Sequence, residues 1–278
     1  MTRPGRGEVT ATIPRPRREA SGHSVVLVGD RFSGFTANGH AATVSDFVAG
    51  LRGGRYDSLV DVFEVELGQG VDASVLAEAE QAIAARGLAD HVLLRAERLP
   101  TPVEARMVHK RDPRNVLLAG FERCDDRTFE AALCIHNDNE LLLDHQTASH
   151  VQGMVLAEAA RQMFLAACES CYARRHPDRS YIYLLTALSS SFARPVFPIS
   201  ARLRLTAHRA DLDDPDNLAF AVSTEVWQAG RRTGATTLEC LGRPADRVYR
   251  SEQRAAAGAL TDVCDLCDIS ATQRVGGP

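Results

Sequence analysis

The sequence has no long apolar run, no excess of positive charge and no glycine-rich phosphate-binding motif. No stretch of about 18 apolar residues occurs in it, so we expect no membrane-spanning helix. The net charge of -4 provides no general basic field, which makes nucleic acid and anionic membrane surfaces unexpected partners. The first 22 residues are basic but lack the apolar centre of a signal peptide, and we expect a cytoplasmic protein.

The seven cysteines are scattered, mostly within apolar runs, which is typical of free thiols in a reducing compartment. Two C-x-x-C pairs, Cys168 with Cys171 and Cys264 with Cys267, lie far apart in the chain, and the first is embedded in a hydrophobic helix pattern. A four-cysteine zinc site is therefore not expected, and nothing in the sequence indicates another metal or a cofactor.

Strand and helix patterns alternate in the first third of the chain. We expect residues 1–22 to be disordered, because proline, arginine and glycine dominate them. The patterns that follow lie at 24–32, 42–54, 58–67, 72–91 and 92–99, of which the second and fourth have helical spacing and the others are typical of strands. The order β-α-β-α-β predicts a small α/β domain with parallel strands over residues 23–100.

A glycine-containing loop follows the first of these strands. Gly29, Gly34 and Gly39 are not spaced as G-x-G-x-x-G, and no Lys-Ser/Thr follows, so the loop is weak evidence for a nucleotide or phosphate site. A structural or docking role is favoured for this domain.

From residue 104 the pattern changes to antiparallel strands around one long helix. Residues 115–139 are typical of a β-hairpin, and further strands are predicted at 181–198, 200–212, 218–230 and 233–242. Between them, the run from Met154 to Cys168 is apolar nearly all round, as expected for a helix that a curved sheet wraps. We therefore expect an α+β domain over 104–245, followed by a disordered tail at 246–278.

Three polar residues interrupt the apolar helix. Glu158, Arg161 and Gln162 lie at i, i+3 and i+4, so they share one face. A buried carboxylate costs several kcal/mol unless it is paired, so we expect Glu158 and Arg161 to contact each other or a bound polar ligand. The alternative is a purely structural ion pair that fixes the register of the sheet.

A loop with two histidines leads into this helix. Asp144 can orient an imidazole such as that of His145, and His150 lies beside the helix start at Gln152 and Gly153. Histidines there can transfer protons near neutral pH, and the free backbone N–H groups of a helix start can stabilise an oxyanion.

The same segment resembles the signature of the A-factor biosynthesis hotdog family, the AfsA-like proteins, in which H-V-P-G-M-x-L-x-E-A-A-R-Q follows an Asp-His pair. Here the stretch is H-V-Q-G-M-V-L-A-E-A-A-R-Q, and the resemblance covers about residues 104–245. The matching positions are Asp144, His145, His150, Val151, Gly153, Met154, Leu156, Glu158, Ala159, Ala160, Arg161 and Gln162. More distantly, the segment is similar to the hotdog dehydratases of fatty-acid synthesis, with which it shares the interval from Gly153 to Glu158.

The resemblance implies a hotdog fold, an antiparallel sheet wrapped around a long central helix, that acts on an acyl thioester of acyl carrier protein or coenzyme A. It implies transfer of a β-ketoacyl group to dihydroxyacetone phosphate, on the way to γ-butyrolactone signals in secondary metabolism. The catalytic residues would be His145 and Glu158, which handle protons, and Arg161, which holds an anionic group. The residues then expected to bind substrate are Asp144, His150, Gln152, Gly153 and Gln162.

Two features depart from the family pattern. The family has two tandem hotdog repeats and this chain has one, so we expect a homodimer to supply the second half of the site. Gln152 replaces the proline of the signature and adds a polar group near the helix start. Two other functions stay open, namely dehydration, isomerisation or cyclisation of a biosynthetic intermediate, and a non-catalytic module that binds a carrier protein or ligand.

Overall fold

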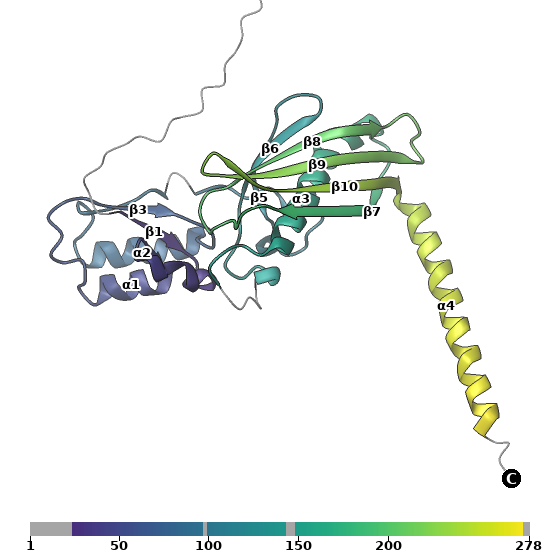
Figure 1. Cartoon of the computed structure of the whole chain (residues 1–278), viewed down its shortest axis with the longest axis horizontal. Helices are drawn as coiled ribbons and strands as arrows, with labels where there is room; N and C mark the ends of the chain where they lie inside the picture. The colour runs from purple at the N-terminus through teal and green to yellow at the C-terminus, as the bar shows by residue number, and fades with distance from the viewer. Residues whose placement is uncertain (1–23, 97–98, 143–147, 275–278) are drawn as a thin grey trace, which may run out of the picture.

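The computed structural model describes residues 24–96, 99–142 and 148–274 and contains two sheets (Figure 1). The first has four strands in the order β2-β1-β3-β4, and the second has six in the order β5-β6-β8-β9-β10-β7. The arm predicted at residues 1–22 lies outside the described residues.

The small α/β domain has the parallel strands that the sequence predicts. They are β1 (Ser24–Val28), β2 (Ala41–Thr43), β3 (Phe63–Leu67) and β4 (Val92–Leu94). Each helix begins at a side-chain cap, Thr43 for α1 (Val44–Arg52) and Asp72 for α2 (Ala73–Ala85), and both helices lie on one face of the sheet (Figure 1). Strand β2 was not predicted, because three residues are too few to show a period.

Strand β1 joins this domain to the second one. Leu27 is buried in the core that β1 shares with the helices, together with Phe47 and Leu51 of α1. Val28, the next residue, is buried in the core of the second domain, because successive residues of a strand face opposite sides. One strand therefore contributes to two cores.

Glycines let the two domains approach closely. A Cβ atom added at Gly68 would lie 2.4 Å from the carbonyl oxygen of Pro198, and one at Gly29 would lie 2.6 Å from the side-chain oxygen of Asn137. A side chain at Gly68 would push against the backbone of the second domain, and one at Gly29 would displace the Asn137 side chain and the backbone of Gly70. The loop after β1 packs against the second domain, because its Phe32 is buried in the core of that domain and its Phe35 lies against Phe197.

The second domain is an antiparallel sheet that curves around helix α3 (Gly153–Ala167), as Figure 1 shows. Its strands are β5 (Leu118–Arg123), β6 (Thr128–Leu133), β7 (Tyr181–Phe192), β8 (Arg202–Asp211), β9 (Leu218–Gln228) and β10 (Arg231–Pro244). Most side chains of α3 are buried, which confirms the expected central helix. The predicted strand at 181–198 is too long, because Pro195 and Pro198 lack the N–H that a ladder needs.

The C-terminal segment differs from the prediction. The sequence predicts a disordered tail at 246–278, but the structure has helix α4 (Ala245–Arg274), which projects from the end of β10 (Figure 1). The prediction is wrong up to Arg274, because alanine-rich sequence favours a helix and Arg250 pairs with Asp246 one turn earlier. None of the helices in the described parts of the chain has the length and apolar character that a membrane crossing requires.

Candidate functional site

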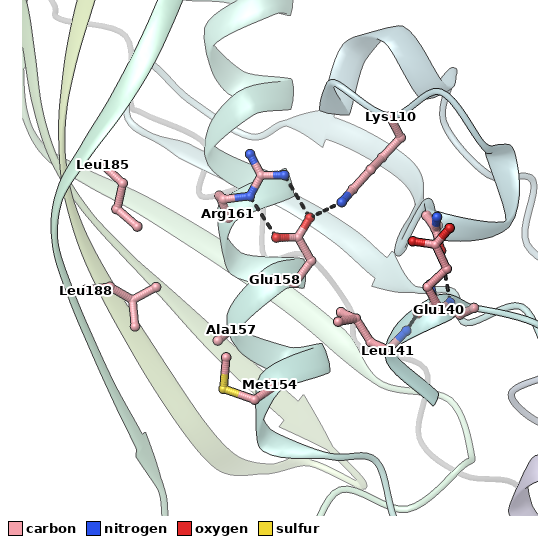
Figure 2. Close-up of a pocket in the computed structure, with 11 residues that line it drawn as sticks. Lys110, Glu140, Leu141, Met154, Ala157, Glu158, Arg161, Leu185 and Leu188 are labelled. Atoms are coloured by element: carbon pink, nitrogen blue, oxygen red, sulfur yellow. Dashed lines mark hydrogen bonds and ion pairs between the residues drawn. The ribbon is translucent and has the colours of Figure 1, made fainter. Parts of the chain in front are cut away.

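A pocket of about 330 Å³ opens beside α3, between the helix, strand β7 and two loops (Figure 2). Leu185 and Leu188 of β7 form its apolar side together with Met154 and Ala157 of α3. The other lining residues are Lys110, Asn115, Asn139, Glu140, Leu141, Glu158 and Arg161. One side of the pocket therefore suits a hydrocarbon chain, and the other suits a polar group.

Glu158 is the centre of the polar side. Arg161 donates from Nε to Oε2 over 2.7 Å and from Nη2 to Oε1 over 2.8 Å, as the dashed lines of Figure 2 show. Nζ of Lys110 lies 2.8 Å from Oε1, and the amide of Gln162 donates to the same oxygen over 3.1 Å. The pair predicted from the i, i+3 spacing is present, and a second cation joins it.

The surroundings of Glu158 set its protonation state. Burial alone would raise its pKa, but the hydrogen bonds from Arg161 and Lys110 and the charge of Arg161 lower the pKa to about 2. The hydrogen bond to Glu158 also raises the pKa of Arg161. Glu158 is therefore an ionised carboxylate near neutral pH, where it has no proton to donate and holds two cations in place.

Arg161 has a donor left for a ligand. Glu158 uses its Nε and Nη2, whereas no hydrogen bond within the described residues occupies Nη1. The side chain is 32% exposed and lines the pocket. A guanidinium fixed in this way can donate to an anionic oxygen without reorienting.

Lys110 was missed by the sequence analysis. It follows a 3-10 turn (Ala105–Val108) that ends at His109, whose φ of 53° is uncommon for a residue with a side chain. The imidazole of His109 lies 2.9 Å from Glu169, and the N–H of Lys110 donates to the carbonyl of Ala105. The sequence gives no signal for this contact, because a single lysine far from Glu158 along the chain has no periodic relation to it.

Gln162 is fully buried and does not open into the pocket. Its amide oxygen accepts from the N–H of Leu117 over 2.8 Å, and its amide nitrogen donates to the carbonyl of Asn115 over 2.9 Å. The expectation that Gln162 binds substrate does not fit this geometry, because the backbone and Glu158 use its polar atoms. Gln162 therefore supports Glu158 by a hydrogen bond from the buried core and does not contact the pocket.

The other predicted site residues are separated. Asp144 and His145 lie outside the described residues. His150 and Gly153 line a second hollow of about 360 Å³, between the start of α3 and the end of β7. Gln152 is the N-cap residue of α3 and makes no side-chain cap hydrogen bond. The structure therefore does not bring His150 to the Glu158 pocket.

One group of potential metal ligands lies close together in the described parts of the chain. Glu122, Cys124 and Glu130 of the β5–β6 hairpin have ligand atoms within 4.8 Å of one another. Burial raises the pKa of the Cys124 thiol, and none of the three residues lines the pocket. Their arrangement gives no reason to assign a metal to the site.

Comparisons with known proteins agree with the fold. Residues 93–242, more than half of the chain, match the model of the A-factor biosynthesis hotdog domain. No curated protein is similar enough to match the chain.

Solved structures with similar coordinates come from several bacteria. AziG of S. sahachiroi is 21% identical, with 46% of this chain and 91% of that chain covered and a TM-score of 0.32. A phenylacetic acid degradation-related protein of Ralstonia eutropha is 17% identical, with 51% and 92% covered and a TM-score of 0.35. A thioesterase variant from Pseudomonas aeruginosa is 11% identical, with 46% and 81% covered and a TM-score of 0.33. By the match of its residues 93–242, the chain belongs to the A-factor biosynthesis hotdog family.

Proposed function

We propose that the protein is an enzyme of secondary metabolism that acts on an acyl thioester of acyl carrier protein or coenzyme A and transfers the acyl group, as γ-butyrolactone synthases do. Family membership supports the thioester chemistry. The observation that carries the proposal is the pocket, in which an apolar wall adjoins two cations fixed by the carboxylate of Glu158.

The proposed reaction uses both sides of the pocket. The acyl chain lies along Leu185 and Leu188, with the thioester carbonyl near Arg161. The acceptor hydroxyl attacks the carbonyl carbon, the C–S bond breaks, and the hydroxyl proton passes to the departing thiolate. Arg161 and Lys110 donate to the developing oxyanion or to the phosphate of the acceptor. We keep His145 as the proposed proton carrier, as the family signature implies.

A second copy of the chain is proposed to close the pocket. β7 is an edge strand of the sheet, and its apolar residues Leu185, Leu188 and Phe192 are 45%, 45% and 51% exposed. An exposed apolar edge is a ready template for another strand. Pairing of β7 with its counterpart in a homodimer would cover these residues. The free cysteines of the described chain are consistent with the cytoplasm as the proposed location.

The test is thiol release from a β-ketoacyl thioester, measured with and without dihydroxyacetone phosphate. The wild-type protein should release thiol faster when the acceptor is present, and Glu158→Ala should not. Equal release by the two proteins would contradict the proposal.

The two alternatives predict other outcomes. A dehydratase, isomerase or cyclase would convert a substrate that has no transferable acyl group, and in such a reaction the ionised Glu158 would serve as the general base and another group as the acid. A non-catalytic binding module would lose stability in Glu158→Gln and show no turnover in any variant. Loss of turnover in a folded Glu158→Gln protein would exclude the binding module.

A further inference from the structure

The small α/β domain contacts the loop that forms one wall of the Glu158 pocket. Asn139, Glu140 and Leu141 line the pocket, and they follow strand β6 after a short loop at residues 134–138. That loop lies against the ends of β1 and β3 of the α/β domain. In open α/β sheets, ligands usually bind outside the carboxyl ends of the strands. Here a loop of the hotdog domain fills part of that position.

Gln69, just after β3, makes the most buried contact of this kind. Its side chain is 6% exposed, its amide oxygen accepts from the N–H of Ile135 over 2.8 Å, and its amide nitrogen donates to the carbonyl of Leu133 over 3.0 Å. The N–H of Gly70 donates to the carbonyl of Ile135 over 2.8 Å. Both backbone groups of Ile135 are therefore bonded to the α/β domain.

The next two residues of the loop are held as well. Nε2 of His136 lies 2.9 Å from Oδ2 of Asp72, the residue that caps α2. The side-chain oxygen of Asn137 accepts from the N–H of Arg31 over 3.0 Å. Three consecutive residues of the loop thus have a partner in the α/β domain.

Further hydrogen bonds connect His136 with the residues that form the pocket wall. Nδ1 of His136 accepts from the N–H of Asp138 over 3.0 Å, and its carbonyl accepts from the N–H of Asn139 over 3.1 Å. Asn139 is 1% exposed, and its side-chain oxygen accepts from the N–H of Leu141 over 3.0 Å. Two contacts therefore connect Asp72 with the wall of the pocket: the one between Asp72 and His136, and the hydrogen bond between His136 and Asn139.

We propose that the α/β domain positions the pocket wall formed by Asn139, Glu140 and Leu141, with Gln69 and Asp72 as its positioning residues. The α/β domain, residues 24–94, would then have a structural role that does not require it to bind a ligand. The position of the wall does not depend on the reaction. Only an effect on turnover rests on the proposed function.

Substitutions at His136 separate the contact between domains from the bond within the loop. In His136→Asn the side-chain oxygen can replace Nδ1 as the acceptor for Asp138, but the side chain is too short to reach Asp72. In His136→Gln the amide nitrogen can replace Nε2 and keep that reach. Gly29→Ala is a second and less selective disturbance of this contact, because its Cβ would lie 2.6 Å from the side-chain oxygen of Asn137 and 2.8 Å from the Cα and carbonyl oxygen of Gly70 in its own domain. Glu78→Gln is the control, since it breaks an exposed ion pair with Arg52 inside the same domain.

The readout is hydrogen exchange of the full chain, followed by mass spectrometry. We expect amides of residues 139–142 to exchange about tenfold faster in His136→Asn and Gly29→Ala, as the loss of one charge-assisted hydrogen bond implies, while β9 keeps its protection. His136→Gln and Glu78→Gln should stay near the wild type. Wild-type exchange of the wall in both His136→Asn and Gly29→Ala would overturn the proposal.

Activity distinguishes a failure of this proposal from a failure of the proposed function. If the wild-type protein releases no thiol, the proposed function fails, but the exchange result still decides the position of the wall. If thiol release is present, His136→Asn should raise KM for the acyl thioester more than it lowers kcat, and His136→Gln should restore it.

Discussion

Glu158 is the residue on which the geometry of the site depends, because it binds both Arg161 and Lys110. We expect Glu158→Gln to lower the free energy of unfolding at pH 7. The change in its pKa corresponds to about 3 kcal/mol, which solvent screening of this partly exposed cluster reduces to about 2 kcal/mol. Urea denaturation measures this. The matched control is Glu130→Gln, because Glu130 is also 17% exposed but pairs with exposed arginines, and its loss should cost less than about 1 kcal/mol.

The same pair predicts how stability depends on pH. The pKa of Glu158 falls from its ordinary 4.5 to about 2 on folding, so the unfolded chain binds the proton more tightly. The stabilisation is therefore complete above pH 4.5 and is lost as the pH falls toward 2. The difference in unfolding free energy between wild type and Glu158→Gln should be constant from pH 7 to about 5 and shrink below that. A difference that grows on acidification would contradict the assigned ion pair.

Substitutions of Lys110 test whether this lysine binds the ligand or only pairs with Glu158. We expect Lys110→Met to lower kcat/KM for thiol release by about tenfold to a hundredfold, the effect of losing one hydrogen bond to a charged group. Lys110→Arg retains the charge and should lose less. Equal kcat/KM in wild type and Lys110→Met, with both proteins folded, would restrict Lys110 to a structural role.

Strand β7 contributes to the apolar side of the pocket and also forms a free edge of the sheet. We expect Leu188→Lys to convert the proposed homodimer into a monomer in sedimentation experiments and to weaken binding of an acyl thioester, because a charge replaces an apolar contact in both places. Leu93→Lys is the control, since Leu93 is 40% exposed on β4, the edge strand of the other sheet. A Leu188→Lys protein with the wild-type mass would argue against pairing through β7.

Elements with a clear period could be predicted from the sequence, and contacts between distant segments could not. The helical spacing of Glu158 and Arg161 placed both on one face of α3, and the apolar run around them predicted a covered helix. Lys110 and the wall at Asn139 reach the same pocket from separate loops, which leave no trace in local spacing. Helix α4 was missed because its described side chains beyond Val248 are largely exposed, so its apolar pattern is weak.

The two sheets of the protein are joined by shared buried residues and hydrogen bonds. Val28 and Phe32 follow the pattern of the α/β domain in sequence but are buried in the core of the hotdog domain, and Gln69 bonds to β6 and the loop after it. We therefore expect both domains to unfold in one cooperative transition. Calorimetry checks this, because a single transition should have equal calorimetric and van't Hoff enthalpies. Two separate transitions would show that the contact between domains contributes little to stability.

A crystal structure with a non-hydrolysable acyl-pantetheine analogue would show whether the pocket beside Glu158 binds the acyl thioester. We expect the acyl chain to lie against Leu185 and Leu188, with the carbonyl oxygen within hydrogen-bond distance of Nη1 of Arg161. An analogue that binds instead in the hollow beside His150 and Gly153, with the Glu158 pocket filled by water, would show that the Glu158 pocket is not the acyl site.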